Sequence, residues 1–304
     1  MVNTRATKAG RPQAPSDGDS GARREREVLA WSRVMDLEAE YNNRARVPGH
    51  PAIIAGWQRD AAAFREAAGG EFDIAYGEHP RQRLDLFRSK DDQSGPLALF
   101  IHGGYWMSFD KDHFSHMARG MEFHGVPVAV PSYRLAPDVR ISDIIEDLRQ
   151  CCLFLWQRHG SRLVIAGHSA GAHLAAAMLA TDWKARGAPE DLVIAGLGVS
   201  GIYDMRPLIP IAVNALLKLD DAEARCTSPL LWKTPAGVFE TWVGGDESEE
   251  FRRQSRSLVA AWLGGGVDAR YREAPGADHF TVIAPLAQPD SALTRAFAQL
   301  CGAP

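Results

Sequence analysis

The sequence predicts an α/β protein with one mostly parallel central sheet, helices on both faces of the sheet and an N-terminal helical extension. From residue 72 onward, short apolar runs alternate with helical stretches, which is the pattern of a parallel sheet covered by helices. The run 192–200 contains no charged residue and is apolar up to its last position, as a strand buried on both faces should be. A Gly-rich turn at 167–171 joins a strand pattern directly to an Ala-rich helix pattern.

The N-terminal part of the chain divides into two segments. Residues 1–24 are rich in Gly, Pro, Ala, Ser and Arg and poor in large apolar side chains, which predicts a disordered tail. Residues 25–68 show apolar side chains at helical spacing, with a second helix expected over 53–68. Because this segment precedes the first strand, we expect it to extend or cap a single domain that spans 25–304.

The rest of the chain predicts regular strand–helix alternation. Two alternating runs, 72–76 and 83–87, predict an antiparallel strand pair. Further strands are expected at 97–101, 126–132, 163–167, 192–200, 239–244 and 267–272. Helices are expected at 115–124, 141–159, 169–181, 250–263 and 291–300. Ligand sites in such sheets lie at the carboxyl ends of the strands, so the residues that follow each strand are the candidates for function.

Composition and charge exclude several function classes. The 304 residues are 45% hydrophobic and 24% charged, and 34 Lys and Arg against 38 Asp and Glu give a net charge of -4. This balance predicts no general attraction to nucleic acid or to an anionic membrane. The same composition is compatible with a homodimer.

The sequence shows neither a secretory signal nor a pattern of paired cysteines. The first 24 residues contain no apolar core of a secretory signal, and the uncharged stretch 163–181 is interrupted by the Gly-rich turn, so we expect no membrane span. The four cysteines, Cys151, Cys152, Cys226 and Cys301, show neither a disulfide framework nor zinc-site spacing. These patterns favour a cytoplasmic location with free thiols.

The Gly-rich turn is a candidate nucleophile site. Gly167-His168-Ser169-Ala170-Gly171 has the form G-x-S-x-G and lies between a strand pattern and a helix pattern. A nucleophile elbow requires this strand–turn–helix context, which exposes the serine hydroxyl. Ser169 is therefore the predicted nucleophile, and a plain Gly-rich turn is the alternative.

A second Gly-rich turn, His102-Gly103-Gly104-Tyr105-Trp106, follows the strand 97–101. Glycines at this place offer N–H groups that no side chain obstructs. With the N–H of Ala170, those of Gly103 and Gly104 are expected to form an oxyanion hole. A phosphate-binding turn is the alternative, but G-x-G-x-x-G and the P-loop lysine are missing.

An activated serine needs a base and a carboxylate that orients the base. His279 follows the last predicted strand and is the expected base. Asp246 follows the strand 239–244 and is the expected acid, with Asp204 and Glu247 as the alternatives. The resulting order serine, acid, histidine suits this fold class. His113 and other nearby side chains do not complete a metal site, so no metal or cofactor is expected.

These motifs together resemble the α/β-hydrolase superfamily. His102-Gly103-Gly104 with the run 133–137 is similar to hormone-sensitive-lipase-like esterases, which usually carry a third glycine where this chain has Tyr105. The run His-Gly-Gly-Tyr-Trp instead resembles kynurenine formamidases (arylformamidases) and their bacterial relatives. Further matching stretches are 41–44, 109–111, 200–204 and 244–254, and the resemblance covers about residues 35–300.

The resemblance implies a serine hydrolase that cleaves an N-formyl aryl amide such as N-formyl-kynurenine, in tryptophan breakdown. A broad carboxylesterase acting on aryl or short-chain esters is the alternative, because it would use the same triad. Five aromatic residues in loops beside the catalytic candidates are expected to line the substrate pocket: Tyr105, Trp106, Tyr133, Tyr203 and Phe280. Arg134, Arg206 and Arg252 are candidate partners for a substrate carboxylate, against the commoner role of solvated surface charge.

Overall fold

The computed structural model describes residues 36–88 and 95–303. The predicted tail 1–24, and the first part of the predicted helical extension, lie outside these residues. Leu37–Pro304 forms one compact unit. Among the described residues, no helix has the length and apolar character needed to cross a membrane.

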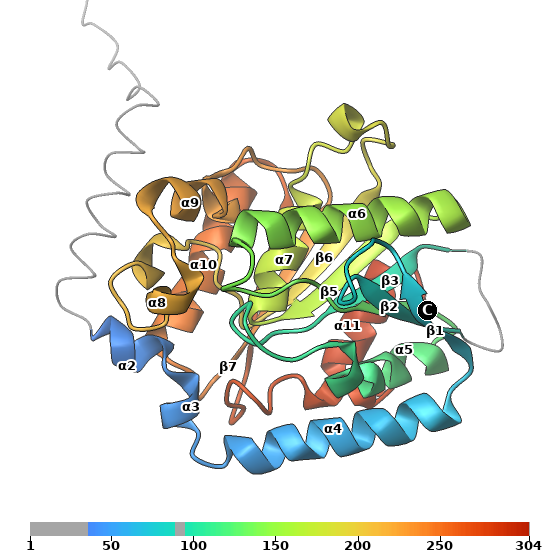
Figure 1. The fold of residues 1–304 in the computed structure, drawn as a ribbon, viewed down its shortest axis with the longest axis horizontal. Helices are drawn as coiled ribbons and strands as arrows, with labels where there is room; N and C mark the ends of the chain where they lie inside the picture. The colour runs from blue at the N-terminus through green and yellow to red at the C-terminus, as the bar shows by residue number, and fades with distance from the viewer. Residues whose placement is uncertain (1–35, 89–94, 304) are drawn as a thin grey trace, which may run out of the picture. The chain divides into compact units, whose positions relative to one another are not determined.

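An eight-stranded sheet runs through the centre of this unit (Figure 1). Its order is β1-β2-β4-β3-β5-β6-β7-β8. β1 and β2, and β2 and β4, pair antiparallel, and the remaining neighbours pair parallel. The strands are β1 (Gly70–Ala75), β2 (Arg83–Phe87), β3 (Leu97–Ile101), β4 (Val128–Pro131), β5 (Leu163–His168), β6 (Val193–Val199), β7 (Val238–Gly244) and β8 (Asp268–Ala274).

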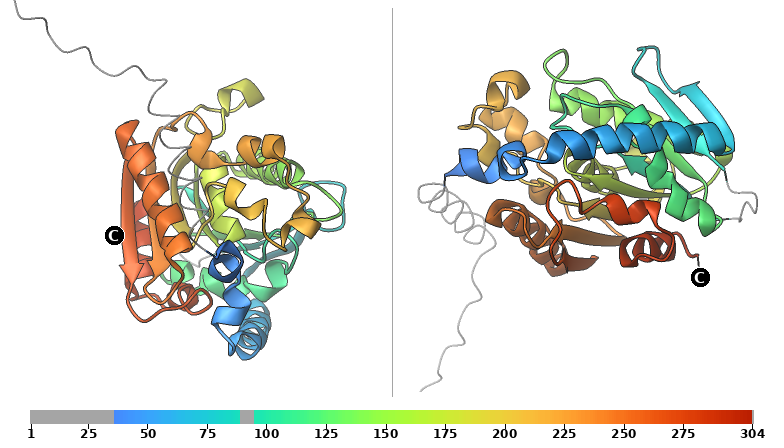
Figure 2. Two further views of the ribbon diagram at one scale, coloured as in Figure 1. Left: turned by 90° about the vertical axis from the view of Figure 1, so that its left-hand side faces the viewer. Right: turned by 90° about the horizontal axis from the view of Figure 1, so that it is seen from below.

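Helices cover both faces of the sheet, as Figures 1 and 2 show. Apolar side chains of β3 alternate between two cores: Leu99 faces one core and Phe100 the other. The first core contains side chains of α6 (Ile141–His159), α7 (Ala170–Leu179) and α10 (Glu249–Gly264). The second contains side chains of α4 (His50–Ala67), α5 (Arg119–Phe123) and α11 (Ala292–Leu300).

Short elements fill the connections. The short α-helices are α2 (Leu37–Tyr41), α3 (Asn43–Arg46), α8 (Asn214–Leu217) and α9 (Asp221–Cys226). The 3-10 turns are η1 (Lys111–His113), η2 (Ser115–Ala118), η3 (Lys184–Arg186), η4 (Arg206–Leu208), η5 (Pro229–Leu231) and η6 (Ala284–Ala287). Most of these short elements follow a strand of the sheet, and α2 and α3 precede α4 near the N-terminus of the described chain.

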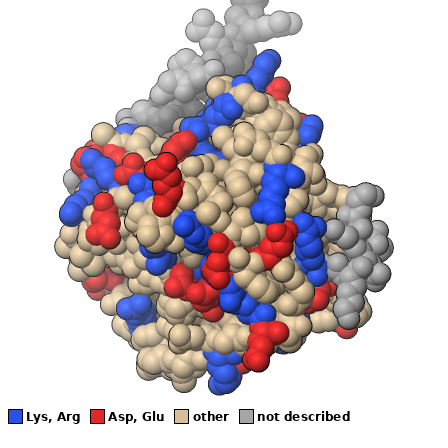
Figure 3. Space-filling model, turned by 45° about the vertical axis from the view of Figure 1, so that its right-hand side comes forward, with Lys and Arg blue, Asp and Glu red and all other residues tan. Residues whose placement is uncertain are grey.

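The predicted α/β-hydrolase fold is confirmed. The eight strands coincide with the eight strand patterns, and the long helices begin and end close to the predicted residues. One expected helix, 115–124, divides into η2 and α5. α4 begins before residue 53, because Pro51 is well tolerated in the first helical turn, whose N–H groups have no partner inside the helix. On the face shown in Figure 3, basic and acidic side chains are interspersed.

Candidate active site

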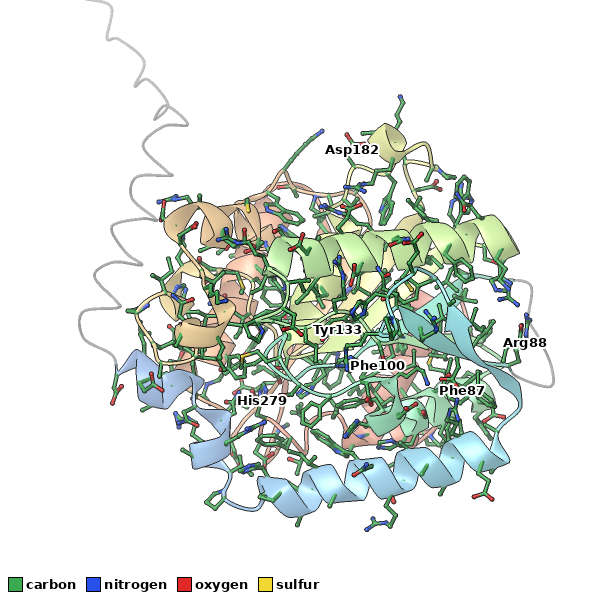
Figure 4. All side chains as sticks on the ribbon, in the orientation of Figure 1. Phe87, Arg88, Phe100, Tyr133, Asp182 and His279 are labelled. Carbon is green, nitrogen blue, oxygen red and sulfur yellow. The ribbon has the colours of Figure 1, made fainter. Side chains whose placement is uncertain are left out.

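The site lies where the parallel strands end. Loops that follow β3, β5, β7 and β8 carry Gly103, Ser169, Glu247 and His279. His279 lies between the sheet and the N-terminal helices in Figure 4, and it shares one pocket with Ser169. The fold thus brings side chains from distant parts of the chain to one edge of the sheet.

Ser169 occupies a strained turn between β5 and α7. Its backbone has φ 55° and ψ -118°, a conformation that costs free energy for a residue with a side chain. Two glycines allow the strand and helix to approach this closely. A Cβ on Gly167 would lie 2.1 Å from the Gly171 carbonyl oxygen, and one on Gly171 would lie 2.0 Å from that of Ile101. The turn therefore has the geometry of a nucleophile elbow.

A hydrogen-bonded series connects the serine to a buried carboxylate. His279 Nε2 lies 3.1 Å from Ser169 Oγ, and His279 Nδ1 lies 2.7 Å from Glu247 Oε2. All three residues are buried. A carboxylate on Nδ1 keeps the proton on that nitrogen and leaves Nε2 free to accept the serine proton. This arrangement can generate a serine nucleophile.

The expected acid Asp246 was wrong by one residue. After β7 the chain turns at Gly245, so that Asp246 is exposed while Glu247 is 5% exposed. The backbone N–H of Asp246 donates to the Ala277 carbonyl at 3.0 Å, which fixes this orientation. The other alternative, Asp204, forms a salt bridge with Arg206 at 2.9 Å. Only the Glu247 carboxylate contacts the imidazole among the three acids that the sequence offered.

Two further groups hold the Glu247 carboxylate in place. Ser200 Oγ donates to Oε1 at 2.5 Å, and the Gly244 N–H donates to the same oxygen at 2.7 Å. Ser200 has φ 56°, so its backbone is also strained. Because both donors bind Oε1, Oε2 remains directed at His279.

The predicted oxyanion donors lie beside Ser169. A Cβ on Gly103 would lie 3.0 Å from Ser169 Cβ, so the Gly103 backbone passes directly against the nucleophile. Gly104 has φ +108°, which a residue with a side chain rarely adopts. Within the described part of the chain, the N–H groups of Gly103, Gly104 and Ala170 have no backbone or side-chain acceptor. They are therefore available to a ligand.

His168 and His102 brace these loops. His168 Nε2 donates to the His279 carbonyl at 2.8 Å, which links the nucleophile turn to the histidine loop. Burial lowers the pKa of His168 well below its ordinary value. Burial also lowers the pKa of His102 to about 4, and the His102 Nδ1–H donates to the Gly103 carbonyl at 2.8 Å. Both imidazoles are therefore neutral positioning groups.

The pocket above Ser169 has aromatic walls. Tyr105 and Phe280 line it, as the sequence predicted. α4 contributes Trp57, whose ring centroid lies 6.0 Å from that of Phe280 and 6.3 Å from that of His168. The sequence did not single out Trp57, Phe109 or Phe114, which also line the pocket. Their apolar pattern is indistinguishable from that of core residues.

Three of the five predicted pocket aromatics were wrong. Trp106, Tyr133 and Tyr203 are fully buried, with 0% exposure, and they do not line the pocket. Trp106 Nε1 donates to His173 Nδ1 at 3.2 Å, and Tyr133 Oη donates to the His102 carbonyl at 2.9 Å. Figure 4 labels Tyr133 near the middle of the view. These rings support the loops from behind instead of facing a ligand.

The three arginines considered for a substrate carboxylate are engaged elsewhere. Arg134 pairs with Asp147 at 2.6 Å, and Arg206 pairs with Asp204. Arg252 donates to the Gly245 carbonyl at 2.7 Å. The cationic side chain that does line the pocket is Arg44, on α3. It belongs to the stretch 41–44 that supported the resemblance, but nothing in its spacing indicated a site.

Comparison with known proteins agrees with this geometry. A family described as having the α/β-hydrolase fold matches residues 98–283. Kynurenine formamidase from Danio rerio is 31% identical over 239 residues, which cover 76% of this chain and 81% of that protein. Kynurenine formamidase from Drosophila melanogaster is 30% identical over 236 residues, with 73% and 78% covered.

A solved structure is also similar to most of this chain. A putative thioesterase from Silicibacter sp. TM1040 has a TM-score of 0.79 and 35% sequence identity, and the alignment covers 88% of this chain and all of that one. The similarity therefore extends over most of this chain.

Proposed function

The chain belongs to the α/β-hydrolase family, in the group that includes kynurenine formamidases, and we propose that it cleaves the carbon–nitrogen bond of an N-formyl aryl amide such as N-formyl-kynurenine. The observation that carries the proposal is the series Ser169–His279–Glu247, which opens into an aromatic pocket. The aromatic walls suit an aryl amine, and a formyl group requires little space beside the nucleophile.

The first half of the reaction forms a formyl-enzyme. His279 Nε2 takes the proton of Ser169 Oγ as that oxygen attacks the formyl carbon. The N–H groups of Gly103, Gly104 and Ala170 bind the resulting oxyanion. When the intermediate collapses, the carbon–nitrogen bond breaks, and the arylamine leaves with the proton from His279. Glu247 stabilises the imidazolium throughout.

The second half restores the enzyme. His279 removes a proton from a water molecule as the water oxygen attacks the formyl ester. The ester bond breaks, the proton on His279 returns to Ser169 Oγ, and formic acid leaves and ionises to formate by releasing its proton to solvent. One water is consumed for each amide cleaved, and no redox change occurs. The proposal thus requires no cofactor.

A carboxylesterase acting on aryl or short-chain esters is the second candidate, because it would use the same triad. Esters and amides pass through the same tetrahedral intermediate, so the triad serves both. What separates them is the protonation of the leaving group, since an arylamine needs the proton of His279 more than an alkoxide or phenoxide does.

The test is a comparison of kcat/KM on N-formyl-kynurenine, p-nitrophenyl acetate and p-nitrophenyl butyrate, with Ser169→Ala as the control. A formamidase should reach about 10⁴ M⁻¹s⁻¹ or more on the formyl amide and much less on the esters. Good ester turnover with negligible formamide turnover, both lost in Ser169→Ala, would instead establish the carboxylesterase.

A further inference from the structure

The N-terminal wall of the pocket carries charged and polar groups that the reaction does not use. Arg44 is the one Lys or Arg among the described residues that line the pocket. Within the described part of the chain it makes no hydrogen bond or ion pair. By contrast, Arg46 on the same short helix pairs with Glu40 at 3.0 Å. Arg44 is thus an exposed pocket-lining cation that forms no ion pair with a described carboxylate.

Asn43, the residue before it, is a buried polar side chain with an unmet hydrogen bond. It is 4% exposed, it lines the pocket, and its Nδ2 has no partner among the described residues. Leaving a buried donor unpaired costs about 1–3 kcal/mol. A ligand acceptor in the pocket would remove that cost, whereas a purely structural role gives no reason for an amide at this position.

A negative charge lies on the same wall. Glu38 lines the pocket, and its Oε2 accepts the Ala212 N–H at 2.8 Å. The wall therefore presents one cation and one anion. This pairing suits a ligand that itself carries both charges, and it disfavours a dianion or a purely hydrophobic group.

The wall is firmly attached to the catalytic loops. The N-cap side chain of Asn42 accepts the Ala45 N–H at 3.1 Å, which fixes the short turn that carries Asn43 and Arg44. The Tyr105 hydroxyl, in the predicted oxyanion loop, donates to the Tyr41 carbonyl. Tyr41 Oη donates in turn to Glu250 on α10 at 2.6 Å. The backbone that carries Asn43 and Arg44 is therefore held in a fixed position relative to the catalytic loops.

We propose that Asn43 and Arg44 bind the carboxylate, and Glu38 the ammonium, of an α-amino-acid group on the aryl substrate. This inference rests on the proposed function for the identity of the aryl amide. It adds the residues that select an amino-acid substrate over a neutral one. In this arrangement the formyl group lies at Ser169, the ring lies between the aromatic walls, and the zwitterionic end contacts the N-terminal helices.

Binding to a Ser169→Ala background tests the proposal without turnover. Three ligands form a matched series: N-formyl-kynurenine, its analogue without the amino group, 4-(2-formamidophenyl)-4-oxobutanoate, and 2′-formamidoacetophenone, which lacks both charges. Arg44→Gln should raise Kd for the two carboxylates about tenfold, as expected for one hydrogen bond to a charged group, and change Kd for the neutral ketone less than about twofold. Glu38→Gln should weaken only the zwitterion.

Arg46→Gln is the matched control. It removes the same charge two residues further along the chain, and the Arg46 side chain does not line the pocket. It should leave all three Kd values unchanged. Equal losses for all three ligands in Arg44→Gln, or no loss for any, would overturn the proposal. Should wild-type enzyme fail to cleave the formyl amide while this charge selectivity persists, the proposed function fails and the subsite stands.

Asn43→Leu separates binding from structure. Because the amide donor is unpaired in the described chain, its removal should leave the melting temperature unchanged or raise it. The same variant should weaken the two carboxylate ligands and leave the neutral ketone unaffected. A lower melting temperature with unchanged Kd values would assign Asn43 to the structure of the turn and contradict its part in the subsite.

Discussion

At the scale of single residues, the two oxygens of the Glu247 carboxylate have different partners. Oε1 accepts hydrogen bonds from Ser200 and the Gly244 N–H, and Oε2 accepts one from His279. We expect Glu247→Gln to lower kcat by about 10²–10⁴-fold. The glutamine NH2 group can donate a hydrogen bond to His279 Nδ1, which favours the tautomer with its proton on Nε2, and that tautomer cannot accept the serine proton. Steady-state kinetics on the best substrate measure this.

Asp246→Asn is the matched control for that substitution. It makes the same chemical change one residue earlier, on an exposed side chain, and kcat should stay within about twofold of wild type, as for a surface substitution remote from the site. If Asp246→Asn lost activity while Glu247→Gln kept it, the assignment of the orienting acid would be reversed.

Sequence patterns predicted well the residues whose position follows from the backbone, such as a serine in a turn between a strand and a helix. They predicted less well which way a loop side chain points. Ser169 was predictable because a strand, two glycines and a helix leave a serine at the turn little choice of orientation. The choice between Asp246 and Glu247 depended on which way a short turn faces. Trp106 and Tyr133 were misplaced for the same reason: a loop residue beside the site can face the ligand or face the core.

At the scale of elements, α4 is held against the sheet by a buried ionic cluster. Arg65 Nε donates to Asp85 Oδ2 at 2.8 Å, and Lys111 Nζ lies 3.1 Å from Asp85 Oδ1. Asp85 is fully buried on β2. Because α4 also carries Trp57 into the pocket, this cluster helps to position one wall of the site.

We expect Asp85→Ala to lower the free energy of unfolding by about 3 kcal/mol, because it leaves the Lys111 ammonium and the Arg65 guanidinium short of a buried counter-charge. Urea denaturation measures the loss, and hydrogen exchange should show faster opening of α4. Asp60→Ala is the control. Asp60 pairs with Arg59 on the exposed side of α4, and such pairs contribute about 0–1 kcal/mol. Equal losses in both variants would contradict a structural role for the cluster.

Most elements were predictable because their patterns are long or strongly periodic. α6 has apolar residues at helical spacing and ends at Gly160, whose φ of 70° suits glycine. The short helices α8 and α9 offered no such pattern, because a helix of one or two turns is stabilised by tertiary packing and not by its own sequence. α2 and α3 lie inside the segment 25–68 that was predicted to be helical, but its spacing gave neither their bounds nor the position of Asn43 and Arg44 at the pocket.

At the scale of the whole molecule, four buried histidines couple stability to pH. Burial lowers the pKa of His102, His116 and His173 to about 4, and that of His168 well below the ordinary value of 6.5. Below pH 6.5 the unfolded chain therefore takes up protons that the folded chain does not. Stability is greatest above that pH and is lost as the pH falls from about 6.5 toward 4.

The size of the histidine contribution shows which titrating groups set the loss of stability between pH 7 and pH 5. His102, His116 and His173 each contribute about 2 kcal/mol of lost stability between pH 7 and pH 5. The salt-bridged carboxylates act at lower pH. For example, hydrogen bonding from Lys111 lowers the pKa of Asp73 below its ordinary 3.8, so its contribution is lost only under more acidic conditions. The window from pH 7 to pH 5 therefore reports the histidines.

His116→Leu should reduce the stability difference between pH 7 and pH 5 by about 2 kcal/mol. His116 lies on η2, it is 4% exposed, and its Nδ1 has no hydrogen-bond partner among the described residues, so leucine removes a titrating group without removing a hydrogen bond of that atom. Urea denaturation at the two pH values gives the difference for each protein. A wild-type stability that is the same at pH 7 and pH 5, or a variant that loses as much as wild type, would show that buried histidines do not set the acid sensitivity of the fold.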